Sequence, residues 1–387
     1  MVMRTHILEE EILIDILTKL PVKSLFRFKC VSKSCKTLLT EPYFKKKHHN
    51  HAKNQPDSRK LLIRIRDKMD SNLYCTSLSP NRLLVNDIHT VPKPPFSRYR
   101  MYCCCDALFL IGIWTEPSQD DEPSMLLLWN PTTSESIVLP PLESPEQEST
   151  YGLGYDSTSD DYKVLRIDKD GSALDEIVAL KSGSWRKIYS PSVRPVGDVS
   201  LLYGKECLPF VNGAFHWLGI EESMMSLNIS DETYKRIPLH KNMSLYLESV
   251  TIEEGLSVLG SMICLFNRND ITFNLWMMKE YGVQESWIKL LTLPCNGAFS
   301  IIPIYSFSDG KVLLRYECPD ELRGMKVIYR TCDHRIWSFD IDPLSFILSG
   351  FVYMESLINP REIDVYPIHK QTDLTFLRKR KREDLLK

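Results

Sequence analysis

The sequence predicts an α+β protein, in which a small three-helix module precedes a large all-β domain. Apolar residues recur at helical spacing in the first forty residues, and from residue 61 onward short β-type runs separated by turn residues replace them. A chain of 387 residues is long enough for both parts. The patterns divide it into a helical module at 4–44, a linker at 45–60, the β-domain at 61–369 and a disordered basic tail at 370–387.

The first predicted helix spans residues 9–19, and its apolar stripe is made by Ile12, Leu13, Ile16, Leu17 and Leu20. Pro21 is expected to end it. A second helix is predicted over 22–28, and a third follows Ser32 as its N-cap and is closed by Pro42. These apolar residues outnumber what so small a bundle could bury. The module is therefore expected to dock on a partner.

Residues 45–60 are polar and basic, and we interpret them as a solvated linker that includes the histidines at 48, 49 and 51. No acidic or thiol partner stands near these histidines, so a metal site is not expected there. The 11 cysteines contain no CxxC pair, and the adjacent Cys103, Cys104 and Cys105 make poor joint ligands for one metal. We interpret the cysteines as reduced, small hydrophobic residues, and we expect no cofactor.

The β-domain is predicted from a weak repeat of about 50 residues, the size of a four-stranded propeller blade. Each repeat unit is an apolar strand pair joined by a polar turn, at 130–133, 182–184, 230–233, 281–282 and 340–343. Strands are expected at 126–129, 162–167, 176–180, 185–189, 215–218, 262–266, 273–277, 311–315 and 335–340. About six units fit, which favours a six-bladed β-propeller-like domain related to kelch propellers. A large β-sandwich with irregular loops is the alternative.

Composition excludes several classes of function. The net charge of −2 indicates neither a nucleic-acid nor a membrane partner, and no apolar run is long enough to span a bilayer. The glutamates at 9–11 argue against a signal peptide, so a cytoplasmic or nuclear location, or both, is expected. A basic cluster near the end is a candidate nuclear localisation signal, formed by Arg378, Lys379, Arg380, Lys381 and Arg382.

No catalytic constellation has the required spacing, and an enzyme is not expected. The chain lacks GxSxG, P-loop and HExxH motifs. Gly152 and Gly154 lack the third glycine of a dinucleotide fold, and we predict a turn there. His216 lies in an apolar strand, where a hydrogen-bonded structural role is expected. Asp160 and Asp161 precede a strand and are interpreted as a turn.

Two parts of the chain resemble one plant family. Residues 8–40, and above all the run 20–34, resemble an F-box, the adaptor-docking module of cullin-RING ubiquitin ligases. The body resembles the F-box-associated domain of the same proteins, in the family's order, at residues 129–133, 152–157, 160–164, 184–187, 210–217, 275–283, 286–287 and 353–357. Each segment is weak alone, but together they cover most of the chain and are specific.

The resemblance implies a non-catalytic substrate receptor of a Skp–cullin–F-box ubiquitin ligase, which holds a target protein for ubiquitination and proteasomal degradation. Its partners would be a Skp-type adaptor, through it cullin and RING subunits, and a protein substrate. The residues expected to bind the adaptor or to form the module's core are Leu8, Ile12, Leu13, Ile16, Leu17, Leu20, Pro21, Val22, Leu25, Phe28, Lys29 and Val31. Phe28 and Lys29 are the two most expected to point outward. The substrate-binding residues stay unassigned.

Two finer implications follow from the same resemblance. The family usually has proline where this chain has Glu9 and tryptophan where it has Cys35, so adaptor binding weaker than usual is expected. A degenerate F-box on a scaffold that assembles no ligase is therefore the alternative. Residues 307–314 and 353–357 are also compatible with the S-locus subgroup, whose substrates are stylar ribonucleases (S-RNases).

Overall fold

The computed structural model describes most of the chain, and all statements below concern its described residues. These are 2–55, 58–67, 70–78, 89–94, 96, 98–115, 123–142, 149–168, 174–188, 207–219, 223–240, 243, 253–295, 298, 300–318, 323–330, 336–338 and 345–363. The predicted basic cluster at 378–382 lies outside them, as does the predicted turn at 340–343.

The head of the chain contains four helices, α1 (Val2–Thr18), α2 (Val22–Phe28), α3 (Lys33–Thr40) and α4 (Pro42–Lys53). The bounds predicted for α2 are confirmed. Ser32 caps α3 as expected, because its hydroxyl accepts a hydrogen bond of 3.0 Å from the Cys35 amide. Helix α1 begins seven residues earlier than the predicted start at residue 9, so the glutamates at 9–11 lie inside it.

The prediction of a solvated linker over residues 45–60 is wrong for its first half. Helix α4 occupies it, and Phe44, Lys45, His48 and His49 are all buried. These positions recur at helical spacing and form one buried face of α4. The two histidines belong to this face despite their polarity. Helix α3 ends at Thr40, before Pro42 as predicted. Pro42 also opens α4, because proline at the first helical position lacks only an amide that needs no partner.

The β-domain consists of antiparallel four-stranded sheets, which are described here from the first strand of each to the last. One is β24 (Ser345–Met354), β1 (Arg59–Asp67), β2 (Asp70–Ser77) and β3 (His89–Val91). The next two are β4 (Tyr99–Cys105), β5 (Leu108–Ile113), β6 (Met125–Asn130) and β7 (Glu135–Val138), then β8 (Ser149–Asp156), β9 (Asp161–Asp168), β10 (Asp175–Ala179) and β11 (Ser184–Ile188).

Three more sheets follow in chain order. They are β12 (Phe210–Val211), β13 (Ala214–Gly219), β14 (Ser223–Asn228) and β15 (Tyr234–Pro238); β16 (Glu253–Leu259), β17 (Met262–Arg268), β18 (Thr272–Met278) and β19 (Trp287–Pro294); and β20 (Ser300–Ser306), β21 (Lys311–Cys318), β22 (Arg323–Arg330) and β23 (Ile336–Ser338). Two short 3₁₀ helices are η4 (Gln284–Ser286) and η6 (Pro360–Glu362).

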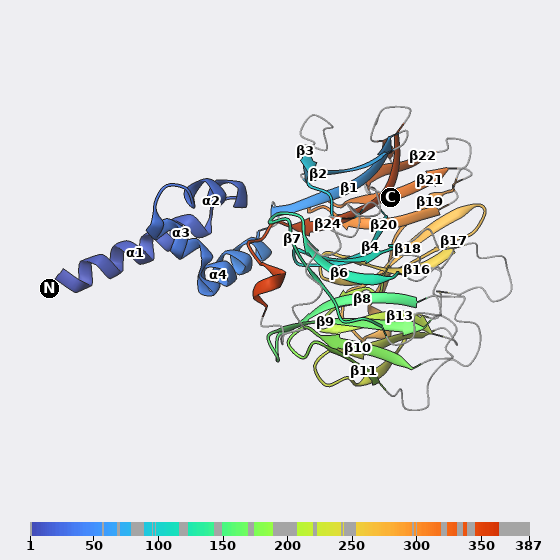
Figure 1. Cartoon of the computed structure of the whole chain (residues 1–387). Coiled ribbons are helices and arrows are strands. Elements are labelled where there is room, and N and C mark those ends of the chain that lie inside the picture. Colours follow the sequence, from blue (N-terminus) through green and yellow to red (C-terminus); the bar gives the residue numbers. More distant parts are fainter. Residues whose placement is uncertain are drawn as a thin grey trace, which may run out of the picture.

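The sheets form a closed ring, which confirms the predicted propeller and excludes the β-sandwich alternative. Inner strands of neighbouring sheets are in contact around the ring, from β4 to β8, β8 to β12 and β13, β13 to β16, β16 to β20 and β20 to β24, and β24 contacts β4. Strand β24 also pairs with β1, so the end of the chain completes the sheet that its beginning started. Figure 1 shows the blades stacked around this ring, with the helical head to one side.

The core lies between neighbouring blades. Six hydrophobic clusters each combine residues of two adjacent sheets, and a seventh fills the helical head. Four of the predicted polar turns, at 130–133, 182–184, 230–233 and 281–282, join the third and fourth strands of successive blades. The weak sequence repeat therefore marks one equivalent position in each of four blades.

Gly152 and Gly154 lie inside strand β8, so the predicted turn at these residues is wrong. A Cβ atom on Gly152 would come within 2.7 Å of the Phe215 ring, and one on Gly154 within 2.6 Å of the Phe210 ring. The two glycines therefore allow the aromatic side chains of the next blade to pack directly on β8. In the part of the chain that the structure describes, no helix is both long and apolar enough to cross a bilayer.

Candidate partner-binding surface on the helical head

The structure separates the predicted binding residues into a core group and a surface group. Leu17, Val22 and Leu25 are buried with Leu38, Leu39, Phe44 and Leu357, and Leu20 packs partly against them. The exposed members are Ile12, Leu13, Ile16, Pro21, Phe28 and Val31. Leu8 lies in α1, and its side chain is outside the described part. Sequence spacing could not make this division, because both groups share the same apolar pattern.

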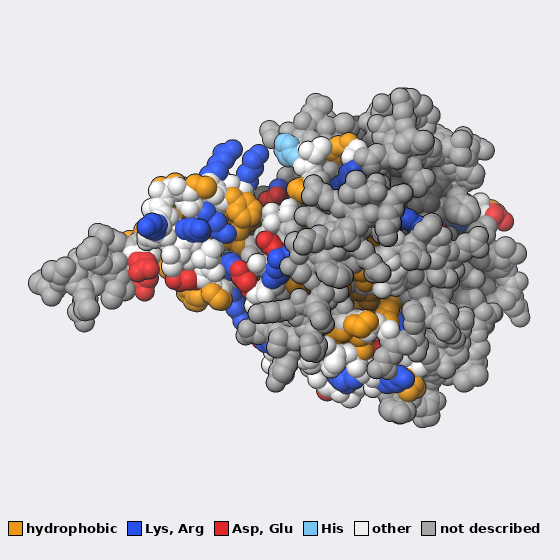
Figure 2. Space-filling view, in the orientation of Figure 1, with side chains coloured by type: hydrophobic (Ala, Val, Ile, Leu, Met, Phe, Trp, Pro, Cys, Tyr) orange, Lys and Arg blue, Asp and Glu red, His pale blue; other side chains and the backbone are white. Residues whose placement is uncertain are grey.

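The surface group is unusually apolar for solvent-facing residues. Ile12 is 60% exposed, Ile16 55% and Val31 70%. Nine large hydrophobic side chains are exposed among the described residues, and six of them lie between residues 12 and 43 of the head. Figure 2 shows hydrophobic side chains gathered on this head among lysines and arginines. Such a concentration on a small module makes it a candidate interaction surface, whereas single exposed apolar residues need no explanation.

Tyr43 belongs to this surface but was not predicted from the sequence. It is 65% exposed in the first turn of α4. One helical turn later, Lys47 forms an ion pair of 2.5 Å with Asp15 of α1, and this pair lowers the pKa of the Asp15 carboxyl. Helix α4 is thus held beside α1. Sequence reasoning missed Tyr43 because it treated Pro42 as the end of the helical part.

Lys29 differs from its prediction. Phe28 is exposed as expected, but Lys29 is half-buried and its ammonium lies 5.2 Å from the centroid of the Phe26 ring. Burial, and then the nearby charge of Lys45, lowers the pKa of Lys29. Its carbon chain therefore packs on the bundle, and only part of the side chain is exposed.

Cys35 is half-buried on α3, and the bundle core closes without it through the packing of Leu38 and Leu39. A cysteine there offers a partner less apolar area than an aromatic side chain would. The expectation of weakened adaptor binding stays a prediction.

The residues that suggested chemistry have structural partners. His216 is fully buried, and its Nε2 atom lies 2.7 Å from the Tyr281 hydroxyl of the next blade. Burial lowers the pKa of His216 to about 4, so the ring is neutral near pH 7. Burial also raises the pKa of the buried cysteine thiols, that of Cys264 to about 12. A histidine with so low a pKa is a weak base, and a thiol that stays protonated is a poor nucleophile.

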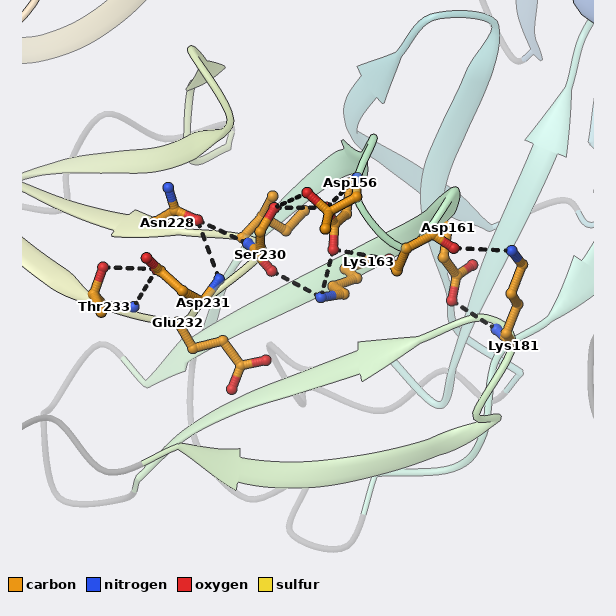
Figure 3. A network of polar contacts seen from close by, with 12 residues as sticks. Asp156, Asp161, Lys163, Lys181, Asn228, Ser230, Asp231, Glu232 and Thr233 are labelled. Carbon is orange, nitrogen blue, oxygen red and sulfur yellow. Dashed lines mark hydrogen bonds and ion pairs between the residues drawn. The ribbon is translucent and has the colours of Figure 1, made fainter.

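Figure 3 shows a polar network on the turns between the third and fourth blades in chain order. Asp156 lies 2.9 Å from the ammonium of Lys163 and accepts a hydrogen bond of 2.6 Å from Ser230 of the next blade. Lys163 also donates to the carbonyl of Ile229 at 2.8 Å. The Asp161 carboxylate accepts a hydrogen bond of 3.0 Å from the Lys181 amide. The contacts of Asp156 and Lys163 pair two buried charges and join two blades, whereas Oδ1 of Asp161 is buried without a hydrogen-bond partner among the described residues.

No group of three or more His, Cys, Asp or Glu side chains is placed to hold a metal ion within the residues that the structure describes. The nine cysteines whose side chains the structure describes are free thiols. The helical head is thus the strongest candidate surface in this chain, and the chemistry it offers is apolar binding.

Comparison with known proteins agrees with this division of the chain. Residues 7–47 match the family model described as the F-box domain, and residues 68–360 match the model described as the F-box associated beta propeller domain. An F-box/kelch-repeat protein of Arabidopsis thaliana is 26% identical over 376 residues, which is 92% of this chain and 97% of that protein. The F-box protein CPR1 of the same plant is 28% identical over 352 residues, or 82% of this chain and 80% of CPR1.

Proposed function

Because this chain belongs to the family of F-box proteins that carry an F-box associated beta propeller domain, we propose that it is the substrate-recognition subunit of a Skp–cullin–F-box ubiquitin ligase. The helical head binds a Skp-type adaptor, which connects it to the cullin and RING subunits. The propeller binds a target protein. The chain itself carries no catalytic residue in this proposal.

The observation that carries the proposal is the concentration of exposed apolar side chains on the head. A head whose core is already filled by buried leucines and Phe44 has no internal use for Ile12, Ile16 and Val31. Covering them with a partner removes apolar area from water, at about 25 cal/mol per Å². The surface group named above, together with Tyr43, is therefore the proposed adaptor-binding surface.

The rate of ubiquitin transfer rises by proximity. The assembled ligase holds lysines of the bound target near the ubiquitin thioester, which raises their effective concentration without any active-site residue in this chain. The consequence for the target is ubiquitination and degradation.

The proposed substrate face is the face of the propeller opposite the head. Turns between first and second strands contact the head, since Asp106 and Asp160 lie in such turns and pair with α4. The fourth strands β7, β11 and β15 end at the opposite face of the propeller, where one blade leads to the next. Recognition residues concentrate at strand ends and loops on one face of a rigid scaffold, so we propose target binding at this face.

The identity of the target stays open within this proposal. A ribonuclease of the S-locus type is one candidate, motivated by residues 307–314 and 353–357. Binding assays against ribonucleases of several haplotypes test it, and uniform absence of binding removes it. The proposed location is the cytoplasm or the nucleus, and the residues at 378–382 are the proposed import signal.

A scaffold that assembles no ligase is the second candidate, and half-buried Cys35 favours it. The family pattern has a tryptophan at this position, and the smaller side chain reduces the apolar contact available to an adaptor. Retention of the intact chain on an immobilised Skp-type adaptor rejects this candidate.

The experiment that tests the proposal compares two tagged proteins in plant tissue with the proteasome blocked. One is the wild-type chain and the other carries Ile16→Asp and Phe28→Asp. We expect adaptor and cullin to co-purify with the wild type alone. A target should co-purify with both proteins but carry ubiquitin chains only with the wild type. Equal recovery of the adaptor with both proteins, or with neither, contradicts the proposal.

A further inference from the structure

Helix α4 contacts the propeller through four basic side chains. Lys45 pairs with Glu362 of η6, and Lys46 lies 3.0 Å from Asp160 in the β8–β9 turn. His49 and Lys53 both face Asp106 in the β4–β5 turn. Figure 1 shows α4 and η6 side by side between the other helices and the blades. One helix face thus meets acidic groups from three separate places on the propeller.

Asp106 is the centre of this contact. Its carboxylate lies 3.4 Å from His49 Nε2 and 3.5 Å from Lys53 Nζ, and it also accepts a hydrogen bond of 3.3 Å from the Tyr162 hydroxyl. Its backbone carbonyl accepts a hydrogen bond from the Met354 amide at the end of β24. Asp106 therefore connects α4 with the second and third blades in chain order and with the closing strand.

The charge of Asp106 is maintained although its side chain is only 9% exposed. Burial alone would raise the pKa of its carboxyl, but the hydrogen bond and charge of His49 and the charge of Lys53 outweigh burial and lower it. An ion pair that is shielded from water in this way orients two elements more strongly than an exposed ion pair does.

The chain after β24 forms the apolar half of the contact, and we call residues 355–363 the docking segment. Asn130 of β6 fixes it to the propeller, because its side-chain amide donates to the carbonyls of Ser356 at 3.1 Å and Ile358 at 2.7 Å. The segment then places Leu357 inside the core of the head, 2% exposed beside Phe44. It also supplies Glu362 to Lys45.

The exit from α4 into the first strand is also held by hydrogen bonds. The Ser58 hydroxyl donates to the carbonyls of Ala52 at 2.5 Å and Gln55 at 2.7 Å. The Asn54 amide donates to the carbonyl of His51. The described residues on both sides of positions 56–57 are thus tied to the end of the helix, directly before β1 begins at Arg59.

We propose that α4 and the docking segment hold the adaptor-binding helices in one fixed orientation relative to the propeller, with Asp106 and Glu362 as its positioning residues. The functional consequence rests on the function proposed above: a target on the far face is presented to the ubiquitin-loaded subunit at one distance and angle. A loosely tethered head would instead sample many separations and lower the effective concentration of target lysines.

The test measures the distance between the head and the propeller in the full chain without any partner. Spin labels are attached at Lys23 of α2 and Lys187 of β11, both exposed, through a ketone-bearing amino acid, because the 11 cysteines preclude thiol labelling. Four proteins are compared: the wild type, Lys45→Glu, the exchange Lys45→Glu with Glu362→Lys, and the control Lys33→Glu on an exposed lysine of α3.

We expect one narrow distance distribution for the wild type and for Lys33→Glu. Lys45→Glu should broaden it roughly twofold, because two glutamates then repel across the contact, and the charge exchange should narrow it again. Asp106→Asn, which keeps the shape of the side chain, is expected to broaden it as well. A broad wild-type distribution, or equal widths in all proteins, overturns the proposal.

Adaptor affinity of the same unlabelled proteins distinguishes this inference from the proposed function. We expect Lys45→Glu to bind the adaptor within about twofold of the wild type, since the proposed binding residues are unchanged. Loss of the narrow distribution with adaptor binding retained supports positioning. A wild type that binds no adaptor refutes the proposed function and leaves the distance test standing.

Discussion

At the scale of single residues, burial of His216 makes the stability of the propeller depend on pH. The pKa of this histidine is 6.5 in the unfolded chain and about 4 in the fold. Between pH 6.5 and pH 4 only the unfolded state binds a proton at His216. The contribution of the neutral histidine to the free energy of unfolding is therefore complete above pH 6.5 and is lost as the pH falls toward 4.

When the pH falls from 7.5 to 5, we therefore expect the free energy of unfolding of the wild type to decrease by about 2 kcal/mol because of His216. The decrease is about 1.4 kcal/mol for each pH unit below the unfolded-state pKa. His216→Gln keeps a polar side chain that does not titrate, and its loss over the same range should be smaller by that amount. Denaturant unfolding at both pH values measures it. Equal losses in the two proteins would show that His216 is not buried neutral.

Several individual residues could be assigned from the sequence, and others could not. Ser32 was predictable as a cap because its role depends on local backbone geometry. The division between buried Leu17 and exposed Ile16 was not, because it depends on which neighbours pack against α1. The role of Leu357 could not be predicted for the same reason, because it packs in the core of the head against residues more than 300 positions earlier in the sequence.

At the scale of elements, strand β8 depends on glycine where the next blade packs on it. Gly152→Ala would place a methyl group 2.7 Å from the Phe215 ring, which is too close without movement. We expect a loss of about 1–3 kcal/mol in the free energy of unfolding.

The double variant Gly152→Ala with Phe215→Leu removes the ring that the methyl group would meet. Its loss should be smaller than the sum of the two single losses, and denaturant unfolding of the four proteins measures the difference. Strict additivity would show that the two residues do not oppose each other across the blade interface.

Helix α4 is the element that was not predicted from the sequence. Its residues are mostly lysine and histidine, and polarity alone indicated a solvated linker. The buried face becomes visible only once the acidic turns at Asp106 and Asp160 are placed opposite it. The predicted strands, by contrast, are visible as short apolar or alternating runs in their own sequence, and nearly all of those predicted and described lie within a residue or two of their observed bounds.

At the scale of the whole molecule, the propeller was predictable from a repeat and the ring closure was not. The polar turns recur at intervals that match the length of one propeller blade, and this repeat predicted the architecture. Pairing of β24 with β1 joins segments at opposite ends of the chain, and no local pattern marks it. The docking segment follows directly from that closure, so the link between head and propeller could be seen only in the complete fold.

The proposed function depends on binding of a Skp-type adaptor to the exposed apolar side chains of the helical head. The most direct test is the dissociation constant of the purified adaptor for the full chain, measured by calorimetry. We compare the wild type, Ile16→Asp with Phe28→Asp, and the control Ile271→Asp, whose isoleucine is 75% exposed on the propeller. We expect the wild type and the control to bind the adaptor, and the double variant to lose about 100-fold or more in affinity. No binding by the wild type, or equal binding by all three, would contradict it.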